Sequence, residues 1–127
     1  MKLIHTADLH LDARMRTHFG PEKAKERQSE LLRTFERLVD TAAAEGCAGI
    51  LIAGDLFDTK HISATVRTQV EKAVREHPDI AFFYLRGNHD SDNFLTELSS
   101  VPDNLHLFEE GWTTYTLGRV VIAGREP

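Results

Sequence analysis

Three short clusters of polar side chains have the residue types that bind divalent metals, and each comes directly after an apolar run. The clusters are Asp8-Leu9-His10 after residues 3–7, Gly54-Asp55 after residues 49–53, and Gly87-Asn88-His89-Asp90 after residues 80–85. Their carboxylate, imidazole and amide donors, without any thiolate, suit manganese, iron or zinc better than they suit a purely structural zinc site. The candidate metal ligands are Asp8, His10, Asp55 and Asn88.

The spacing within and between these clusters points to phosphoryl chemistry. Asp8 and His10 are two positions apart, so both side chains lie on the same side of an extended backbone. Asp55 has two carboxylate oxygens and can bridge two metals, which at a separation of about 3.5–4 Å activate a water for attack on a phosphoryl group. His89 is then available to stabilise the phosphate oxygens or to protonate the leaving oxygen. The structural alternative is a set of ordinary turn residues at strand ends.

An alternation of strand and helix patterns would bring the three clusters together. Apolar runs predict strands at residues 1–7, 48–54 and 80–85, and helical periodicity predicts helices over residues 22–45 and from Ser63 to His77. This order favours an α/β fold with right-handed crossovers and a mainly parallel sheet flanked by helices. Because the carboxyl ends of parallel strands share one edge, we expect all three clusters at the edge where such folds bind ligands.

The remaining pattern predicts further elements and a core. A short helix is expected at residues 92–98, a turn at Pro102-Asp103, and strands at 104–108, 112–117 and 120–123, the last two joined as a hairpin. Leu31, Phe35, Leu38 and Ala42 recur at helical spacing on the first helix, and Val66, Val70, Ala73 and Val74 do so on the second. Both sets are expected to face the sheet.

Several single residues have a structural interpretation. His5 is expected in the core or beside the metal ligands, and His106 at the surface or in packing. Trp112, Tyr115 and Phe108 are expected in the core or on a surface that another part of the protein covers. Cys47 is interpreted as a small buried residue at the start of a strand.

Composition sets the class of protein. The 127 residues suit one domain, and 20 acidic against 15 basic side chains give a net charge of −5. An acidic chain lacks the overall charge of a nucleic-acid binder, although Arg14, Arg16, Lys60 and Arg86 flank the clusters and could contact phosphates. A single cysteine excludes an intrachain disulfide and fits a cytoplasmic protein. No apolar run approaches the roughly 20 residues that cross a membrane.

The clusters resemble the first three motifs of the calcineurin-like metallophosphoesterases. The matching segments are Asp8-Leu9-His10, Gly54-Asp55-Leu56-Phe57-Asp58 and Gly87-Asn88-His89-Asp90. Residues 5–12 and the helix through residues 34–39 further resemble the DNA repair exonuclease branch, the nuclease subunits of SbcD type. This resemblance spans nearly the whole chain and implies an α/β/β/α sandwich, of which residues 1–127 would form the N-terminal half.

The resemblance also implies roles for the clustered residues. Asp8 and His10 would hold one metal, Asn88 the other, and Asp55 would bridge the two metals. His89 would be the catalytic histidine beside the scissile phosphate. The expected cofactors are two divalent metals, manganese first with iron or zinc as alternatives. The expected reaction is hydrolysis of DNA phosphodiesters by a two-metal-activated water, with an SMC-like ATPase as partner.

One departure from the family pattern lies in the downstream part. The family completes its site with a Gly-His and a Gly-His-x-His motif, which do not occur before Pro127, and His106 belongs to neither. We therefore expect residues 1–127 to be the N-terminal part of a nuclease domain, inactive alone or completed by a second copy in a homodimer. Two alternatives stay open. They are a small-molecule phosphodiesterase or protein phosphatase on the same scaffold, and a truncated, non-catalytic interaction module.

Overall fold

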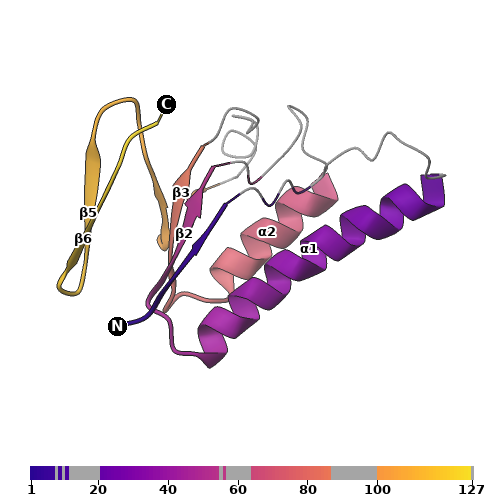
Figure 1. Ribbon diagram of the computed structural model, residues 1–127, viewed down its shortest axis with the longest axis horizontal. Coiled ribbons are helices and arrows are strands. Elements are labelled where there is room, and N and C mark those ends of the chain that lie inside the picture. The colour runs from indigo at the N-terminus through magenta and orange to yellow at the C-terminus, as the bar shows by residue number, and fades with distance from the viewer. Residues whose placement is uncertain are drawn as a thin grey trace.

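The computed structural model describes residues 1–7, 9, 11, 21–54, 56, 64–86 and 100–126. In chain order these residues form β1 (Leu3–Thr6), α1 (Pro21–Ala44), β2 (Gly49–Ala53), α2 (Ala64–Arg75), β3 (Ala81–Leu85), β4 (Leu105–Leu107), β5 (Thr113–Leu117) and β6 (Val120–Gly124). The alternation of strands and helices confirms the predicted α/β class (Figure 1). The predicted helix at residues 92–98 and the expected helix start at Ser63 lie outside the described residues.

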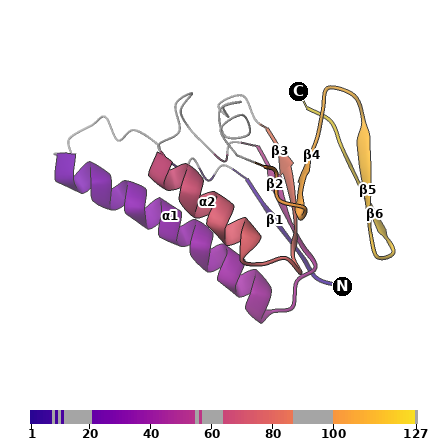
Figure 2. The same cartoon turned by 180° about the vertical axis from the view of Figure 1, so that it is seen from behind.

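The four strands β1 to β4 form one parallel sheet, as the sequence predicts. They lie side by side in chain order, and every pair of neighbours is parallel. The predicted hairpin is also present, because β5 and β6 pair antiparallel around a turn in which Gly118 has a φ of 60°. Helices α1 and α2 cover one face of the parallel sheet, and the hairpin lies against the other face (Figures 1 and 2).

Alternate side chains of the sheet form a core with the helices. Ile50, Ile52, Phe82 and Tyr84 pack there with Phe35, Val39, Val70 and Val74. The predicted stripe of α2 is confirmed, because Val66, Val70, Ala73 and Val74 are all buried. On α1, Phe35 and Ala42 are fully buried, Leu31 and Leu38 are partly buried, and Val39 is a core member that the predicted stripe omits. The helical period therefore located the buried face on both helices.

Helix α1 is closed at its C-terminal end by a glycine. Gly46 has a φ of 66°, in the left-handed region that glycine adopts at low cost. The N–H of Gly46 donates to the carbonyl oxygen of Ala43 at 3.2 Å, and the N–H of Cys47 donates to that of Ala42 at 2.9 Å. This pair of bonds is a Schellman motif, which turns the chain directly into β2. Cys47 is buried and free, as expected.

Aromatic side chains hold the hairpin against the sheet. The ring of His106 stacks on that of Phe83 with a centroid distance of 5.0 Å, and Tyr115 of β5 lies 4.8 Å from His106. Phe108 meets Tyr115 edge-on at 5.5 Å. The hydroxyl of Tyr115 donates a hydrogen bond to the carbonyl oxygen of Leu107. His106, Phe108 and Tyr115 therefore have the packing roles that the sequence left open for them, whereas Trp112 is exposed.

One of the two expectations for His5 is wrong. Its side chain is exposed on β1 and so lies outside the core. A place beside the metal ligands stays a prediction, because those ligands lie outside the described residues. β1 is an edge strand, and the ring of Tyr115 in the hairpin contacts Phe83 of β3 and His106 of β4, away from His5. The neighbouring Ile4 points to the helix face and packs against the core there.

A polar side chain fastens the end of α2 to the start of β4. The amide nitrogen of Asn104 lies 2.8, 2.9 and 3.0 Å from the carbonyl oxygens of Val74, His77 and Ile80. The N–H of Leu105 donates to the carbonyl oxygen of Pro102 at 3.0 Å, which confirms the predicted turn.

Neither helix in the described part of the chain has the length and apolar character that a membrane span requires.

Candidate metal centre

The strands that precede the three clusters end at the same edge of the sheet. Thr6 of β1 is level with Ile52 of β2, and Ile52 is level with Tyr84 of β3. In the sequence, Asp8 follows β1 by two positions, Asp55 follows β2 by two, and Asn88 follows β3 by three. The three strands therefore end at one edge of the parallel sheet, and the chain continues from there into each cluster. Ligand sites of parallel α/β folds lie at this edge.

The first two cluster segments are joined by a hydrogen bond just beyond the strands. The backbone N–H of Leu11 donates to the carbonyl oxygen of Leu56 at 2.7 Å. Both leucine side chains are buried in the core on the helix side, with 1% and 2% of their surface exposed. Leu11 directly follows His10, and Leu56 directly follows Asp55. This bond holds the backbone just after His10 next to the backbone just after Asp55, although the two segments are far apart in the sequence.

The predicted site residues themselves lie outside the part of the chain that the structure describes. They are Asp8, His10, Asp55, Asn88 and His89. The same holds for the basic residues Arg14, Arg16 and Lys60. Their assignment therefore stays a prediction, supported by the placement of their neighbours Leu9, Leu11, Gly54, Leu56 and Arg86.

The donor set of these predicted ligands fits a divalent metal. Two carboxylates, an imidazole and an amide oxygen supply the hard and intermediate donors that manganese, iron and zinc accept. Within the described ranges, no three histidine, cysteine, aspartate or glutamate side chains come together as a metal site would require. The strand-end clusters are thus the candidate centre, and nothing in the described part competes with them.

Arg86 is the basic residue near the clusters that the structure places, and it makes an ion pair. Its Nε donates to Oε1 of Glu126 at 2.9 Å, and its Nη2 donates to Oε2 at 2.7 Å. The pair links the end of β3 to the chain just beyond β6. No sequence pattern indicated this contact, because the two residues are 40 positions apart and share no periodicity.

A pocket of about 360 Å³ lies beside this ion pair, at the same edge of the sheet. Its lining residues are Tyr84, Arg86, Leu107, Phe108, Glu109, Glu110 and Glu126. Three of these seven side chains are glutamates, and Arg86 is the single basic one. Because Arg86 is bound to one of the glutamates, the pocket keeps an excess of negative charge and is poorly suited to an anionic substrate.

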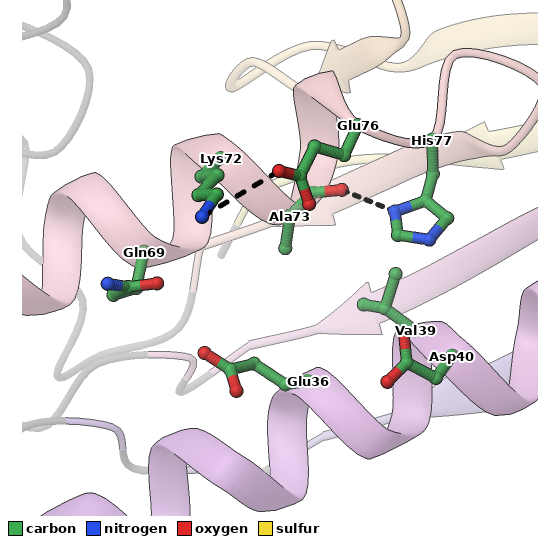
Figure 3. A pocket seen from close by; sticks show the side chains of 8 residues that line it. All are labelled: Glu36, Val39, Asp40, Gln69, Lys72, Ala73, Glu76 and His77. Carbon is green, nitrogen blue, oxygen red and sulfur yellow. Dashed lines mark hydrogen bonds and ion pairs between the residues drawn. The ribbon is translucent and has the colours of Figure 1, made fainter.

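A second hollow, of about 340 Å³, lies between α1 and α2 (Figure 3). Its polar side chains include Glu36, Asp40, Lys72, Glu76 and His77. Lys72 pairs with Glu76 at 3.8 Å, and Nδ1 of His77 lies 2.8 Å from the carbonyl oxygen of residue 73. None of the predicted site residues lines this groove, which lies between the helices and not at the strand ends.

Comparison with known proteins identifies relatives of this chain. A family model described as calcineurin-like phosphoesterase matches residues 1–124. The DNA double-strand break repair protein Mre11 of Aeropyrum pernix is 35% identical over 98 residues, which are 76% of this chain and 22% of the relative. The SbcD chain of the nuclease SbcCD from Escherichia coli K12 is 30% identical over 99 residues, which are 76% of this chain and 23% of the relative.

A solved structure shares the fold. The crystal structure of the Pseudomonas putida nuclease MPE matches with a TM-score of 0.50 and 22% sequence identity, covering 87% of this chain and 49% of that chain. This likeness concerns the fold alone. The chain spans less than a quarter of the length of the two curated relatives above.

Proposed function

The chain belongs to the calcineurin-like phosphoesterase family, and we propose that it contributes the first part of a two-metal site that hydrolyses phosphodiester bonds in DNA. The observation that carries this proposal is the Leu11–Leu56 hydrogen bond at the shared edge of β1 and β2. It joins the backbones that directly follow His10 and Asp55. A site made from both segments needs this proximity.

Each predicted site residue has a role in this proposal. Asp8 and His10 would hold one divalent metal, Asn88 the other, and the two oxygens of Asp55 would bridge them. Bound metals of this kind supply Lewis acidity, which makes a water nucleophilic at neutral pH and offsets the charge of a phosphate. His89 would contact the phosphate oxygens or hold the proton that the leaving oxygen takes.

The proposed substrate is DNA, and the support for it comes from the names of the relatives. One is a DNA double-strand break repair protein, and another is one subunit of a nuclease. Because the second name implies an assembly, it is consistent with our proposal of a partner of SMC-like ATPase type. We further propose that residues 1–127 are the N-terminal part of a nuclease domain, whose remaining metal ligands come from further residues of that domain or from a second copy.

An activity assay with two site variants tests this function. The wild-type chain, Asp55→Asn and His89→Ala are incubated with manganese and either labelled single- or double-stranded DNA or an aryl phosphodiester. We expect Asp55→Asn to abolish any manganese-dependent cleavage because the bridging charge is lost, and His89→Ala to lose cleavage while retaining metal. Wild-type turnover in Asp55→Asn would overturn the assignment of the site.

The choice of substrate separates the alternatives. Cleavage of the aryl diester without cleavage of DNA would favour a small-molecule phosphodiesterase on the same scaffold. A folded chain that retains manganese but cleaves neither substrate would assign catalysis to a longer protein or to an assembly. A folded chain that does not retain manganese would favour a non-catalytic interaction module.

A further inference from the structure

We infer that Glu126 is a positioning residue for the metal centre and acts through Arg86. The Arg86–Glu126 ion pair would hold the end of β3 in the place from which the chain enters the Gly87-Asn88-His89-Asp90 cluster. This inference rests on the proposed function, since it assigns a support to that same site. By this inference the β5–β6 hairpin supports the metal site, although the hairpin contains no predicted ligand.

The geometry of the pair is that of a strong, directed contact. Both oxygens of Glu126 accept hydrogen bonds from Arg86, at 2.9 and 2.7 Å. The side chains are 32% and 12% exposed, so the contact is partly shielded from water. A bidentate arginine–carboxylate pair fixes the orientation of both groups as well as their separation. By comparison, the Lys2–Glu45 pair joins side chains that are 65% and 59% exposed.

Glu126 is itself held firmly by its surroundings. Its backbone N–H donates to the carbonyl oxygen of Glu109 at 2.9 Å. Two positions earlier, Gly124 packs so closely on the ring of Phe108 that an added Cβ would lie 2.6 Å from two ring carbons. The same Phe108 ring contacts Tyr115, which docks the hairpin on the sheet. Glu126 is thus anchored to the hairpin and to the segment before it, and can serve as a fixed partner for Arg86.

The donor atoms that Arg86 uses also distinguish two roles for this residue, namely support of the strand end and binding of a substrate phosphate. The Nε and Nη2 groups that bind Glu126 form the fork that would bind a phosphate in the same bidentate way. With the carboxylate in place, this side of the guanidinium is occupied. The pair therefore supports the strand end rather than the substrate. Metal ligands need support of this kind, because they must be held to within about 0.5 Å of the productive geometry.

The test compares Glu126→Gln with a matched control. The glutamine keeps the size of the side chain and one acceptor oxygen but removes the negative charge that Arg86 pairs with. Glu71→Gln is the control, because Glu71 also pairs with an arginine, Arg75, at 3.0 Å, but on α2 away from the strand ends. Manganese affinity is measured from the loss of the free Mn²⁺ electron paramagnetic resonance signal. Amide hydrogen exchange of residues 81–86 and 120–126 gives a readout that needs no metal.

We expect Glu126→Gln to weaken manganese binding about tenfold, the lower end of what the loss of a ligand's supporting contact costs. Exchange at residues 81–86 should rise in this variant, and Glu71→Gln should keep manganese affinity within about twofold of wild type. Arg86→Gln should give a similar loss, and the double variant should lose less than the sum of the two singles, because both break one contact.

Three results would overturn the inference, and they are distinguishable. Manganese affinity in Glu126→Gln as high as in wild type, with exchange raised at residues 81–86, would show that the pair only stabilises the fold. Tighter binding of inorganic phosphate by Glu126→Gln would show that Glu126 competes with substrate for Arg86. If the wild-type chain binds no manganese while its exchange pattern is that of a folded protein, the proposed function fails for this chain, and the inference fails with it.

Discussion

The two faces of the parallel sheet are covered in different ways, and two neighbouring rows of side chains make the difference visible. On the helix face, Ile4, Ile50, Phe82 and Leu105 lie level with one another across the four strands. On the other face, one position further along, His5, Leu51, Phe83 and His106 lie level in the same way. The first row belongs to one continuous core with α1 and α2, whereas the second begins at an exposed His5.

This difference indicates that the two faces of the sheet have separate roles. The helix face removes a large, continuous apolar area from water, which is the dominant favourable term in folding. The contacts on the hairpin face include the stacked rings of Phe83 and His106, the Tyr115 ring tilted against His106, and the ion pair between Arg86 and Glu126. We therefore expect the helix face to set global stability, and the hairpin face to set the position of the strand ends near the predicted site.

The largest expected effect is at the centre of the helix-face row. Phe82 is fully buried, so Phe82→Ala removes a ring from the core and leaves a cavity. We expect the free energy of unfolding to fall by about 3–5 kcal/mol, measured by urea denaturation. Val121→Ala, at a side chain that is 64% exposed on the hairpin, should change it by less than about 0.5 kcal/mol. A loss of unfolding free energy in Phe82→Ala as small as that in Val121→Ala would contradict the expectation that the helix face sets global stability.

An intermediate effect is expected where the hairpin meets Phe108. Gly124→Ala would place a Cβ 2.6 Å from two carbons of the Phe108 ring, so the ring or the strand must move. We expect a loss of about 1–3 kcal/mol in the free energy of unfolding, together with weaker manganese binding, because Glu126 lies two positions further on. The matched control is Gly111→Ala, whose Cβ would meet no atom within 4 Å. Equal effects of the two substitutions would argue against close packing at Gly124.

The smallest expected effect is at the hydroxyl of Tyr115. Tyr115→Phe keeps the ring contacts with His106 and Phe108 but removes the hydrogen bond to the carbonyl oxygen of Leu107. We expect a loss of about 1 kcal/mol in the free energy of unfolding, with faster amide exchange confined to β5 and β6. Faster exchange in α1 or α2 instead would mean that the two faces unfold as one unit.

The sequence predicted the parts of this fold that follow from local patterns. The helical stripe at Phe35 and Ala42 and the apolar strands required only short-range periodicity, and the parallel sheet followed from their alternation. The edge shared by β1, β2 and β3 was predicted for the same reason. The core alternative for His5 was wrong, because alternation along a strand indicates that two faces exist but not how fully another segment covers each of them.

Contacts between distant segments were not predictable from the pattern. Arg86 and Glu126 are 40 residues apart, and Asn104 bonds to carbonyl groups 24 to 30 residues before it. Each depends on how the sheet places two loops, so no spacing rule signals it. The ligand roles of Asp8 and Asp55 are different, because the sequence predicts them and the structure does not test them. They rest on residue type and order and concern positions outside the described residues.

The most direct test of the central claim is the manganese content of the purified chain. Wild type and Asp55→Asn are loaded with manganese, freed of excess, and analysed for metal per chain, with circular dichroism to confirm that both are folded. We predict that the wild type retains manganese and that Asp55→Asn retains almost none, because the shared ligand of the strand-end site is lost. Equal manganese content in the two folded proteins would contradict a metal site at the ends of β1, β2 and β3.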